Sequence, residues 1–163
     1  MILVTLGTQD KPFTRLIQAV EKQIELGNIQ DEVIVQSGCT QYKSDKMKII
    51  DYLTIEEFQK LMKSADILIT HGGVASIIEG LKNNKKVIAV ARKQEYGEHV
   101  NNHQEQIIEN FESQGYILGL KKLDELNKVL EEAKQFETKQ YESNNQIFIN
   151  KIKDEIELLI NEE

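Results

Sequence analysis

The chain has 163 residues, of which 27 are acidic and 20 are basic, and its formal net charge is −7. This length suits one compact domain, and a hydrophobic content of 40% excludes a disordered or fibrous chain. The acidic balance argues against a nucleic-acid partner, because general nucleic-acid binding needs a basic surface that displaces counterions from phosphates.

The cysteine content and the hydropathy pattern favour the cytoplasm. The single cysteine, Cys39, cannot form an internal disulfide, which fits a reducing compartment. Residues 1–7 are apolar but lack the positive charges that begin a secretory signal peptide. No apolar run approaches the length of about 18 residues that a membrane span needs. We therefore expect a cytoplasmic protein that works at a membrane only through a partner.

Short apolar segments alternate with helical patterns along most of the chain. The expected strands are residues 2–6, 33–36, 47–50, 66–70, 86–91 and 116–120. The segments 67–70 and 87–90 are nearly continuous aliphatic runs, as in strands that are buried on both faces. A capping box at residues 54–57 predicts one helix start, and an apolar stripe over 74–81 predicts a second helix. This alternation predicts an α/β fold with a Rossmann-like, doubly wound, mostly parallel sheet.

The last part of the chain has a different pattern. We assign residues 1–122 to the α/β domain and residues 123–163 to a C-terminal helical segment of the same domain. This segment has no strand pattern, and its apolar residues recur at helical spacing, as at Phe148, Ile152, Ile156 and Leu159. Two interpretations stay open: a long terminal helix packs back on its own core, or it reaches a partner subunit.

The segment 69–80 is the most informative for function. An expected buried strand leads through His71, Gly72 and Gly73 directly into the helix that follows. Ligands of open α/β sheets bind at the carboxyl ends of the strands, and the first N–H groups of a helix attract anions. Ser76 is placed to donate to a phosphate, and Glu79 is placed to accept hydrogen bonds from a ribose diol. The alternative is an ordinary glycine-rich turn with a solvated glutamate.

Other nucleotide motifs are absent or incomplete. Neither a Walker A loop nor a full G-x-G-x-x-G fingerprint is present. The turn after the first strand, residues 7–10, also leads toward a helix near Phe13, so it and the turn at Gly73 are expected to face one crevice. Alone, this first turn is weak evidence.

The polar segment 92–104 follows another expected strand end, where a group that reads substrate belongs. His99 and His103 have the spacing of a zinc pair, but the H-E-x-x-H pattern and a third ligand are missing, so we expect no metal. The absence of Asp-x-Asp argues against a metal-dependent nucleotide-sugar site. The alternative for this segment is a solvent-exposed turn. For Cys39 we expect no nucleophilic role.

The combination of three motifs resembles a known family. Residues 4–8, the turn 71–73 and the segment 92–104 are similar to the C-terminal, nucleotide-sugar-binding domain of family 28 glycosyltransferases, which has the GT-B architecture. The likeness covers nearly the whole chain. It is strongest to stand-alone subunits, namely the catalytic subunit of the two-chain dolichol-linked GlcNAc transferase and its bacterial capsule and exopolysaccharide counterparts. The chain departs from the family pattern at Asn101 and Asn102, because the family often has acidic residues at these positions.

The resemblance implies a set of substrate-binding residues. Thr8 would approach the diphosphate, residues 73–76 would present N–H groups and a hydroxyl to it, Glu79 would bind the ribose, and His103 and Gln104 would contact the sugar. The full predicted set is Thr8, His71, Gly72, Gly73, Val74, Ala75, Ser76, Glu79, Arg92, His99, His103 and Gln104. No cofactor is expected, because the UDP-sugar is the donor substrate.

The resemblance also implies a partner. In complete enzymes a second domain supplies the acceptor site and usually the general base, and this chain has no room for one. The expected function is therefore the donor-binding subunit of an inverting glycosyltransferase for UDP-glucose or UDP-galactose, with a membrane-attached partner that holds a lipid-linked acceptor. Two rival hypotheses stay open: a non-catalytic enhancer of a partner transferase, and a self-sufficient enzyme that processes nucleotide sugars.

Overall fold

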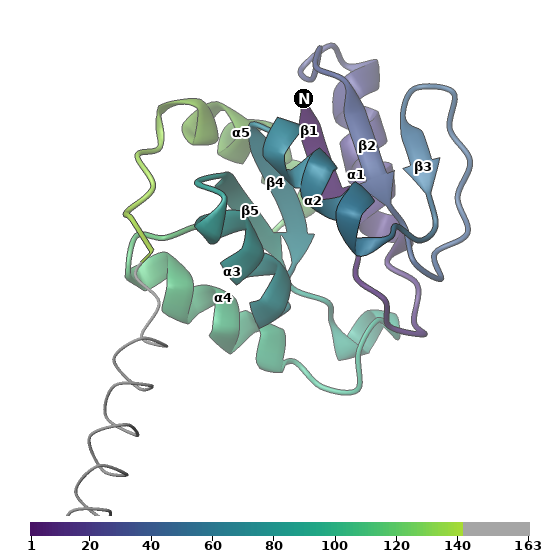
Figure 1. The fold of residues 1–163 in the computed structure, drawn as a ribbon. Coiled ribbons are helices and arrows are strands. Elements are labelled where there is room, and N and C mark those ends of the chain that lie inside the picture. The colour runs from purple at the N-terminus through teal and green to yellow at the C-terminus, as the bar shows by residue number, and fades with distance from the viewer. Residues whose placement is uncertain (142–163) are drawn as a thin grey trace, which may run out of the picture.

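The computed structural model describes residues 1–141, and the expected helix around Phe148 to Leu159 lies outside this range (Figure 1). Within the described range, the chain forms one sheet with helices on both faces, the α/β, Rossmann-like arrangement that the sequence predicted. None of the helices in this range is long and apolar enough to cross a membrane.

The sheet has six parallel strands in the order β3-β2-β1-β4-β5-β6. The strand bounds are Ile2–Thr5 for β1, Val33–Gln36 for β2, Lys48–Ile50 for β3, Ile67–His71 for β4, Lys86–Val90 for β5 and Leu118–Gly119 for β6. Every expected strand is present. The last is shorter than predicted, because β6 lies at the sheet edge and pairs with β5 only through Leu118 and Gly119.

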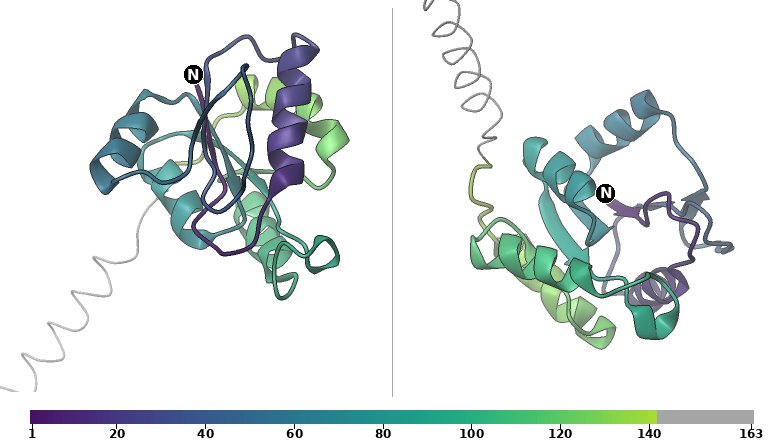
Figure 2. Two further views of the ribbon diagram at one scale, coloured as in Figure 1. Left: turned by 90° about the vertical axis from the view of Figure 1, so that its right-hand side faces the viewer. Right: turned by 90° about the horizontal axis from the view of Figure 1, so that it is seen from below.

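Within residues 1–141, five α-helices connect and follow the strands. Their bounds are Thr14–Glu25 for α1, Ile55–Ser64 for α2, Val74–Lys82 for α3, His103–Ser113 for α4 and Leu126–Gln135 for α5, with short 3₁₀ turns at Gln94–Tyr96 and Leu123–Glu125. The predicted capping box at Thr54 and the predicted helix over 74–81 are both confirmed. Figure 2 shows α2 and α3 on one side of the sheet and α1 and α5 on the other.

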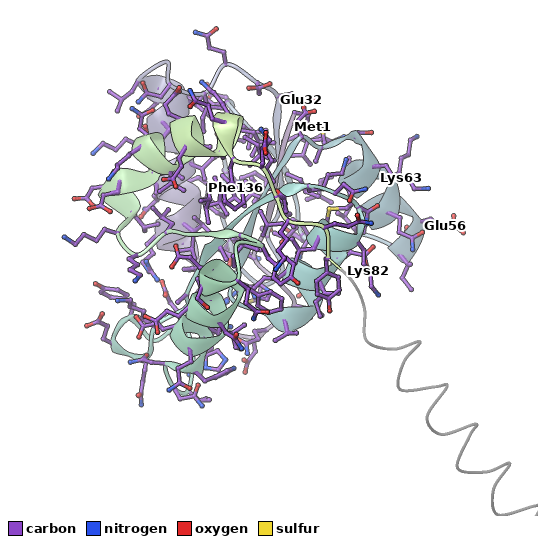
Figure 3. All side chains as sticks on the ribbon, turned by 90° about the vertical axis from the view of Figure 1, so that its left-hand side faces the viewer. Met1, Glu32, Glu56, Lys63, Lys82 and Phe136 are labelled. Atoms are coloured by element: carbon purple, nitrogen blue, oxygen red, sulfur yellow. The ribbon has the colours of Figure 1, made fainter. Side chains whose placement is uncertain are left out.

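Each face of the sheet has its own apolar core. One core joins the sheet to α1 and α5 through residues such as Leu16 and Leu130, and the other joins it to α2, α3 and α4 through Met62, Ile77 and Ile108. The charged residues Glu56, Lys63 and Lys82 lie on the outer surface of α2 and α3 (Figure 3). Helix α5, within the described part of the C-terminal segment, packs on the first of these cores through Leu126, Leu130 and Ala133.

The strand order creates a switch point next to β1. The chain passes from β1 outward through β2 and β3, and then returns to place β4 on the other side of β1. Loops that follow β1 and β4 therefore separate at the carboxyl edge, where open α/β sheets bind their ligands.

Candidate functional site

A cleft of about 730 Å³ opens at this switch point. It is walled by the β1–α1 loop, the end of β2, the β3–α2 segment, the β4–α3 turn with the first half of α3, and the β5–α4 loop. The lining residues are Thr5, Gly7, Thr8, Gln9, Gln36, Tyr52, Leu53, Thr54, Ile55, Phe58, Gln59, His71, Gly73, Ala75, Ser76, Glu79, His99, His103 and Gln104. The turns after β1 and β4 thus face the same cavity.

The β4–α3 turn needs both of its glycines for close packing. A Cβ on Gly73 would lie 2.0 Å from His71 Cε1, and a Cβ on Gly72 would lie 2.7 Å from Gln104 Cβ. The N–H of Gly73 donates to His71 Nδ1 at 2.7 Å, and the N–H of Gly72 donates to Gln104 Oε1 at 3.1 Å. The turn is therefore fixed by side chains from β4 and α4 before the helix begins.

The N-terminus of α3 is open. Its N-cap is Gly73, which has no side chain to accept from the first N–H groups, and no acidic residue stands in the first turn. Ala75 and Ser76 line the cleft, whereas Val74 and Gly72 do not. Uncapped N–H groups and the positive end of the helix dipole favour an anion at this position.

Glu79 projects into the same cleft from the next turn of α3. One carboxylate oxygen, Oε1, accepts from Asn83 Nδ2 at 3.2 Å, and Asn83 Nδ2 also donates to the Glu79 backbone carbonyl at 2.9 Å. The second oxygen accepts no side-chain hydrogen bond within residues 1–141. The carboxylate is therefore held in place while keeping an acceptor for a hydroxyl ligand.

His71 is a neutral imidazole in this site. Burial, together with the nearby charge of Arg92 and with His99, lowers its pKa to about 4. Because Nδ1 accepts from Gly73, the ring proton is on Nε2, beside Gly7, where an added Cβ would lie 2.3 Å from Nε2. The side chain thus lines the cleft as an N–H donor without carrying a charge.

All three histidines of the chain line the cleft. His99 and His103 pack edge to face with their ring centroids 4.7 Å apart. The N–H of Asn101 donates to His99 Nδ1 at 3.3 Å, and Gln9 Nε2 lies 3.1 Å from His99 Nε2. Since a neutral ring with an accepting Nδ1 carries its proton on Nε2, the amide of Gln9 must turn to present its oxygen there. The β1–α1 and β5–α4 loops therefore meet across the cleft.

Gln104 connects two of the site's walls. It is 4% exposed, and its Oε1 accepts from the N–H of Gly72 and also from the N–H of Arg92 at 3.0 Å. It therefore ties the β4–α3 turn to the end of β5 and still reaches the cleft. Thr8, also predicted for the site, lies exposed on the β1–α1 loop at the cleft wall.

Arg92, like Gly72 and Val74, was predicted for the site but does not line the cleft. It is 1% exposed, and its guanidinium is occupied by backbone carbonyls of other loops. Within the described residues, its Nε is the one buried side-chain N or O atom without a hydrogen-bond partner. The interpretation of the β5–α4 loop as a solvent-exposed turn also fails in part, because Glu98 and His99 are buried.

The β3–α2 wall was not predicted from the sequence. Tyr52, Leu53, Ile55 and Phe58 give this side of the cleft an apolar surface, and Tyr52 and Ile55 are strongly exposed. The capping box located the start of α2, but nothing in its pattern shows which way that helix faces. Among residues 1–141, no group of three or more His, Cys, Asp or Glu side chains is placed to hold a metal ion.

The sequence and the fold are similar to those of known proteins. Residues 1–159 match the family model described as "Glycosyltransferase family 28 C-terminal domain". A curated relative from Candida glabrata, "UDP-N-acetylglucosamine transferase subunit ALG13", is 30% identical over 91 residues, which are 55% of this chain and 42% of that protein. The match thus spans less than half of the relative's length.

Two solved structures are similar in fold. The solution structure of ALG13 is 21% identical, covers 87% of this chain and 89% of its own, and has a TM-score of 0.56. The calicheamicin glycosyltransferase CalG4 is 13% identical, covers 81% of this chain and 33% of its own, and has a TM-score of 0.60. At these identities the likeness shows the fold.

Proposed function

This chain belongs to the glycosyltransferase family 28 C-terminal domain family, and on that premise we propose that it is the UDP-sugar-binding subunit of a two-component inverting glycosyltransferase. A membrane-attached partner subunit holds a lipid-linked saccharide acceptor, and the transferred sugar is a hexose, glucose or galactose, in capsule or exopolysaccharide synthesis. The chain works in the cytoplasm, at the inner face of the membrane through its partner.

One observation carries the proposal. The open N-terminus of α3 and the carboxylate of Glu79 line one cleft, about one and a half helical turns apart. The N–H groups of Ala75 and Ser76 suit a diphosphate, and the free oxygen of Glu79 suits a ribose diol. The apolar wall at Tyr52 and Phe58 suits a nucleobase. These three surfaces match the parts of a nucleoside diphosphate.

The chemistry follows from where charge develops. An acceptor hydroxyl, deprotonated by a base on the partner subunit, attacks the anomeric carbon, and the bond from that carbon to the UDP oxygen breaks. Negative charge grows on the leaving diphosphate, so N–H donors at α3 stabilise the transition state more than the ground state. The neutral His71, with its proton on Nε2, adds a donor in the same region. Inversion at the anomeric carbon follows from a single in-line displacement.

The donor sugar has one rival to glucose and galactose. The Candida glabrata relative is named as a UDP-N-acetylglucosamine transferase subunit. UDP-GlcNAc is therefore tested beside the two hexose donors. His103 and Gln104, on the β5–α4 side of the cleft, are the residues we assign to the sugar.

Isothermal titration of the purified chain tests the donor site. The titrants are UDP, UDP-glucose, UDP-galactose and UDP-GlcNAc, without divalent metal. We expect Glu79→Gln to weaken UDP binding at least about tenfold, because a charged acceptor contributes about 1.5–3 kcal/mol to a hydrogen bond. Glu132→Gln, at an exposed position of α5 on the other side of the sheet, is the matched control and keeps wild-type affinity.

Transfer assays separate catalysis from enhancement. Sugar transfer by the co-purified partner is measured with the wild-type chain and with Glu79→Gln. Loss of transfer with the variant supports a donor-binding subunit, whereas full transfer shows a non-catalytic enhancer. Release of UDP from a UDP-sugar by the chain alone shows instead a self-sufficient enzyme.

A further inference from the structure

A charged cluster, in which two of the three side chains are buried and the third is partly buried, lies outside the lining of the cleft. It consists of Arg15 from α1, Arg92 from the end of β5 and Glu98 from the β5–α4 loop. Arg92 is 1% exposed and Glu98 is 4% exposed. Burying a charge costs free energy unless other groups compensate it, so the hydrogen-bond partners of these side chains show what the cluster holds in place.

Arg92 fastens the β1–α1 loop. Its Nη2 donates to the carbonyl of Leu6 at 2.6 Å, and its Nη1 donates to the carbonyl of Lys11 at 2.7 Å. These carbonyls flank the segment that carries Thr8 and Gln9. Nη1 also donates to the carbonyl of Glu98 at 3.2 Å, so one guanidinium holds the backbones of both loops.

Glu98 fastens the β5–α4 loop from the opposite direction. Its carboxylate accepts from Arg15 Nε at 2.6 Å and from Arg15 Nη2 at 2.9 Å, a two-point pair, and Oε2 also accepts from the N–H of Lys93 at 3.0 Å. Arg15 Nη2 donates in addition to the carbonyl of Ala91 at 2.7 Å. The residue after Glu98 is His99, which the cluster therefore places.

The two guanidiniums share one aromatic ring. Arg15 Cζ lies 5.0 Å and Arg92 Cζ lies 4.8 Å from the ring centroid of Phe13, which is fully buried at the start of α1. Such contacts stabilise cations most where water is excluded. The cluster thus spans α1, the β1–α1 loop and the β5–α4 loop as one connected network.

We propose that Arg92 and Glu98 are positioning residues for the phosphate and sugar end of the donor, an inference that rests on the proposed function. They hold the two loops so that Gln9 and His99 meet and Thr8, His103 and Gln104 face the cleft together. The ribose and base walls, at Glu79 and Tyr52, stand outside this network. Breaking it therefore changes recognition of one end of the ligand and not the other.

A ligand series tests this division. Affinities for uridine, UMP, UDP and the preferred UDP-sugar are measured for wild type and Glu98→Gln by chemical-shift titration. We expect the variant to bind uridine within twofold of wild type and the UDP-sugar at least tenfold more weakly, with the loss growing along the series. Glu25→Gln removes an exposed ion pair with Lys46 and is the matched control, with no loss for any ligand.

The histidine ring nitrogens give a readout that needs no ligand. We expect ¹⁵N shifts of the wild type to show His99 as a single tautomer with its proton on Nε2, because Nδ1 accepts from the N–H of Asn101. In Glu98→Gln we expect these shifts to move toward an average of both tautomers, while those of His71 stay unchanged. Arg92→Lys, which keeps the charge but not the fork of donors, shows the same His99 change.

Three results would overturn the positioning role: an equal loss for every ligand, no loss for any, or unchanged His99 shifts in both variants. If wild type binds none of the four ligands, the proposed function is what fails, and the His99 shifts still decide whether the cluster positions the loops.

Discussion

Helices α2 and α3 both begin at the carboxyl edge of the sheet and both line the cleft, yet their N-termini are opposites. At α2, the Thr54 side chain accepts from the N–H of Glu57 at 3.2 Å, and the Glu57 carboxylate accepts from the N–H of Thr54 at 2.9 Å. At α3, the N-cap is Gly73 and no side chain accepts from the first turn.

The difference shows that two helix termini at the same edge of the sheet suit different parts of a ligand. At the α2 terminus, the N–H groups of Thr54 and Glu57 already donate within the capping box. The first turn also carries two acidic residues, Glu56 and Glu57, so this terminus repels anions. What α2 offers the cleft is apolar surface at Ile55 and Phe58. The α3 terminus keeps its donors and lacks acids, so an anion is the group that completes it.

The largest expected effect is a loss of stability at low pH, when His71 in the β4–α3 turn becomes protonated. His71 has a pKa of about 4 in the fold against an ordinary value of 6.5, so the fold favours its neutral form. The free energy of unfolding is therefore highest, as far as His71 is concerned, above pH 6.5, and it decreases as the pH falls toward 4. Between about pH 7 and 4.5 the decrease amounts to about 2.5 kcal/mol of the free energy of unfolding. Urea unfolding at both pH values measures it.

Two variants isolate this contribution. In His71→Gln the loss between the two pH values is smaller by about 2.5 kcal/mol, whereas Gln59→Ala, which changes an exposed and uncharged residue of the same cleft, keeps the wild-type loss. The stabilisation from the α2 cap is lost only at lower pH, because the hydrogen bond from the N–H of Thr54 lowers the pKa of Glu57 below 4.5. Equal losses in wild type and His71→Gln would show that the ring does not stay neutral in the fold.

A carboxylate added to the α3 terminus makes it resemble α2. We expect Ser76→Asp to weaken UDP binding by about 2 kcal/mol, roughly thirtyfold, while the free energy of unfolding rises by about 0.3–1 kcal/mol, since an acid near a helix start favours the helix. Calorimetric titration and urea unfolding measure the two changes. Ser76→Asn has a similar shape but no charge, so it separates the effect of charge from that of size. Normal UDP binding by Ser76→Asp would contradict the assignment of the anion site to this terminus.

The smallest expected effect is loss of the α2 cap. Thr54→Ala removes the side-chain acceptor and should lower the free energy of unfolding by about 1 kcal/mol. We expect UDP affinity to change less than threefold, because this terminus supplies no donor to the anion. Thermal unfolding and titration of one preparation compare the two, and Thr54→Ser, which keeps the acceptor, is the control. A large loss of UDP affinity would move part of the anion site to α2.

The fold was predictable because its signals are local. The aliphatic runs at 67–70 and 87–90 are central strands of the sheet, and the capping box at Thr54 needs only four consecutive residues. The part of the site on α3 was predictable for the same reason, because a strand, two glycines and a helix follow one another. Phe148 to Leu159 lies outside the described residues, and the partner role of that segment stays a prediction.

The rest of the site depends on contacts between distant segments. Arg92 stands in a polar stretch of sequence, and its burial follows only from carbonyls at Leu6 and Lys11 on a different loop. Tyr52 and Ile55 resemble ordinary surface residues until the sheet places α2 beside α3. A pattern of neighbouring residues carries neither kind of information.

The central place of β1 also constrains how the chain acquires its shape. As a ribosome releases the chain, Ile2–Thr5 emerges before both of its neighbouring strands, and one of these, Ile67–His71, is made only after β2, β3 and α2. Until then one side of β1 has unpaired backbone groups, an exposed edge of the kind that promotes aggregation. The strand that closes this edge leads directly into Gly72 and Gly73, so nascent-chain folding and assembly of the α3 terminus become a single late event.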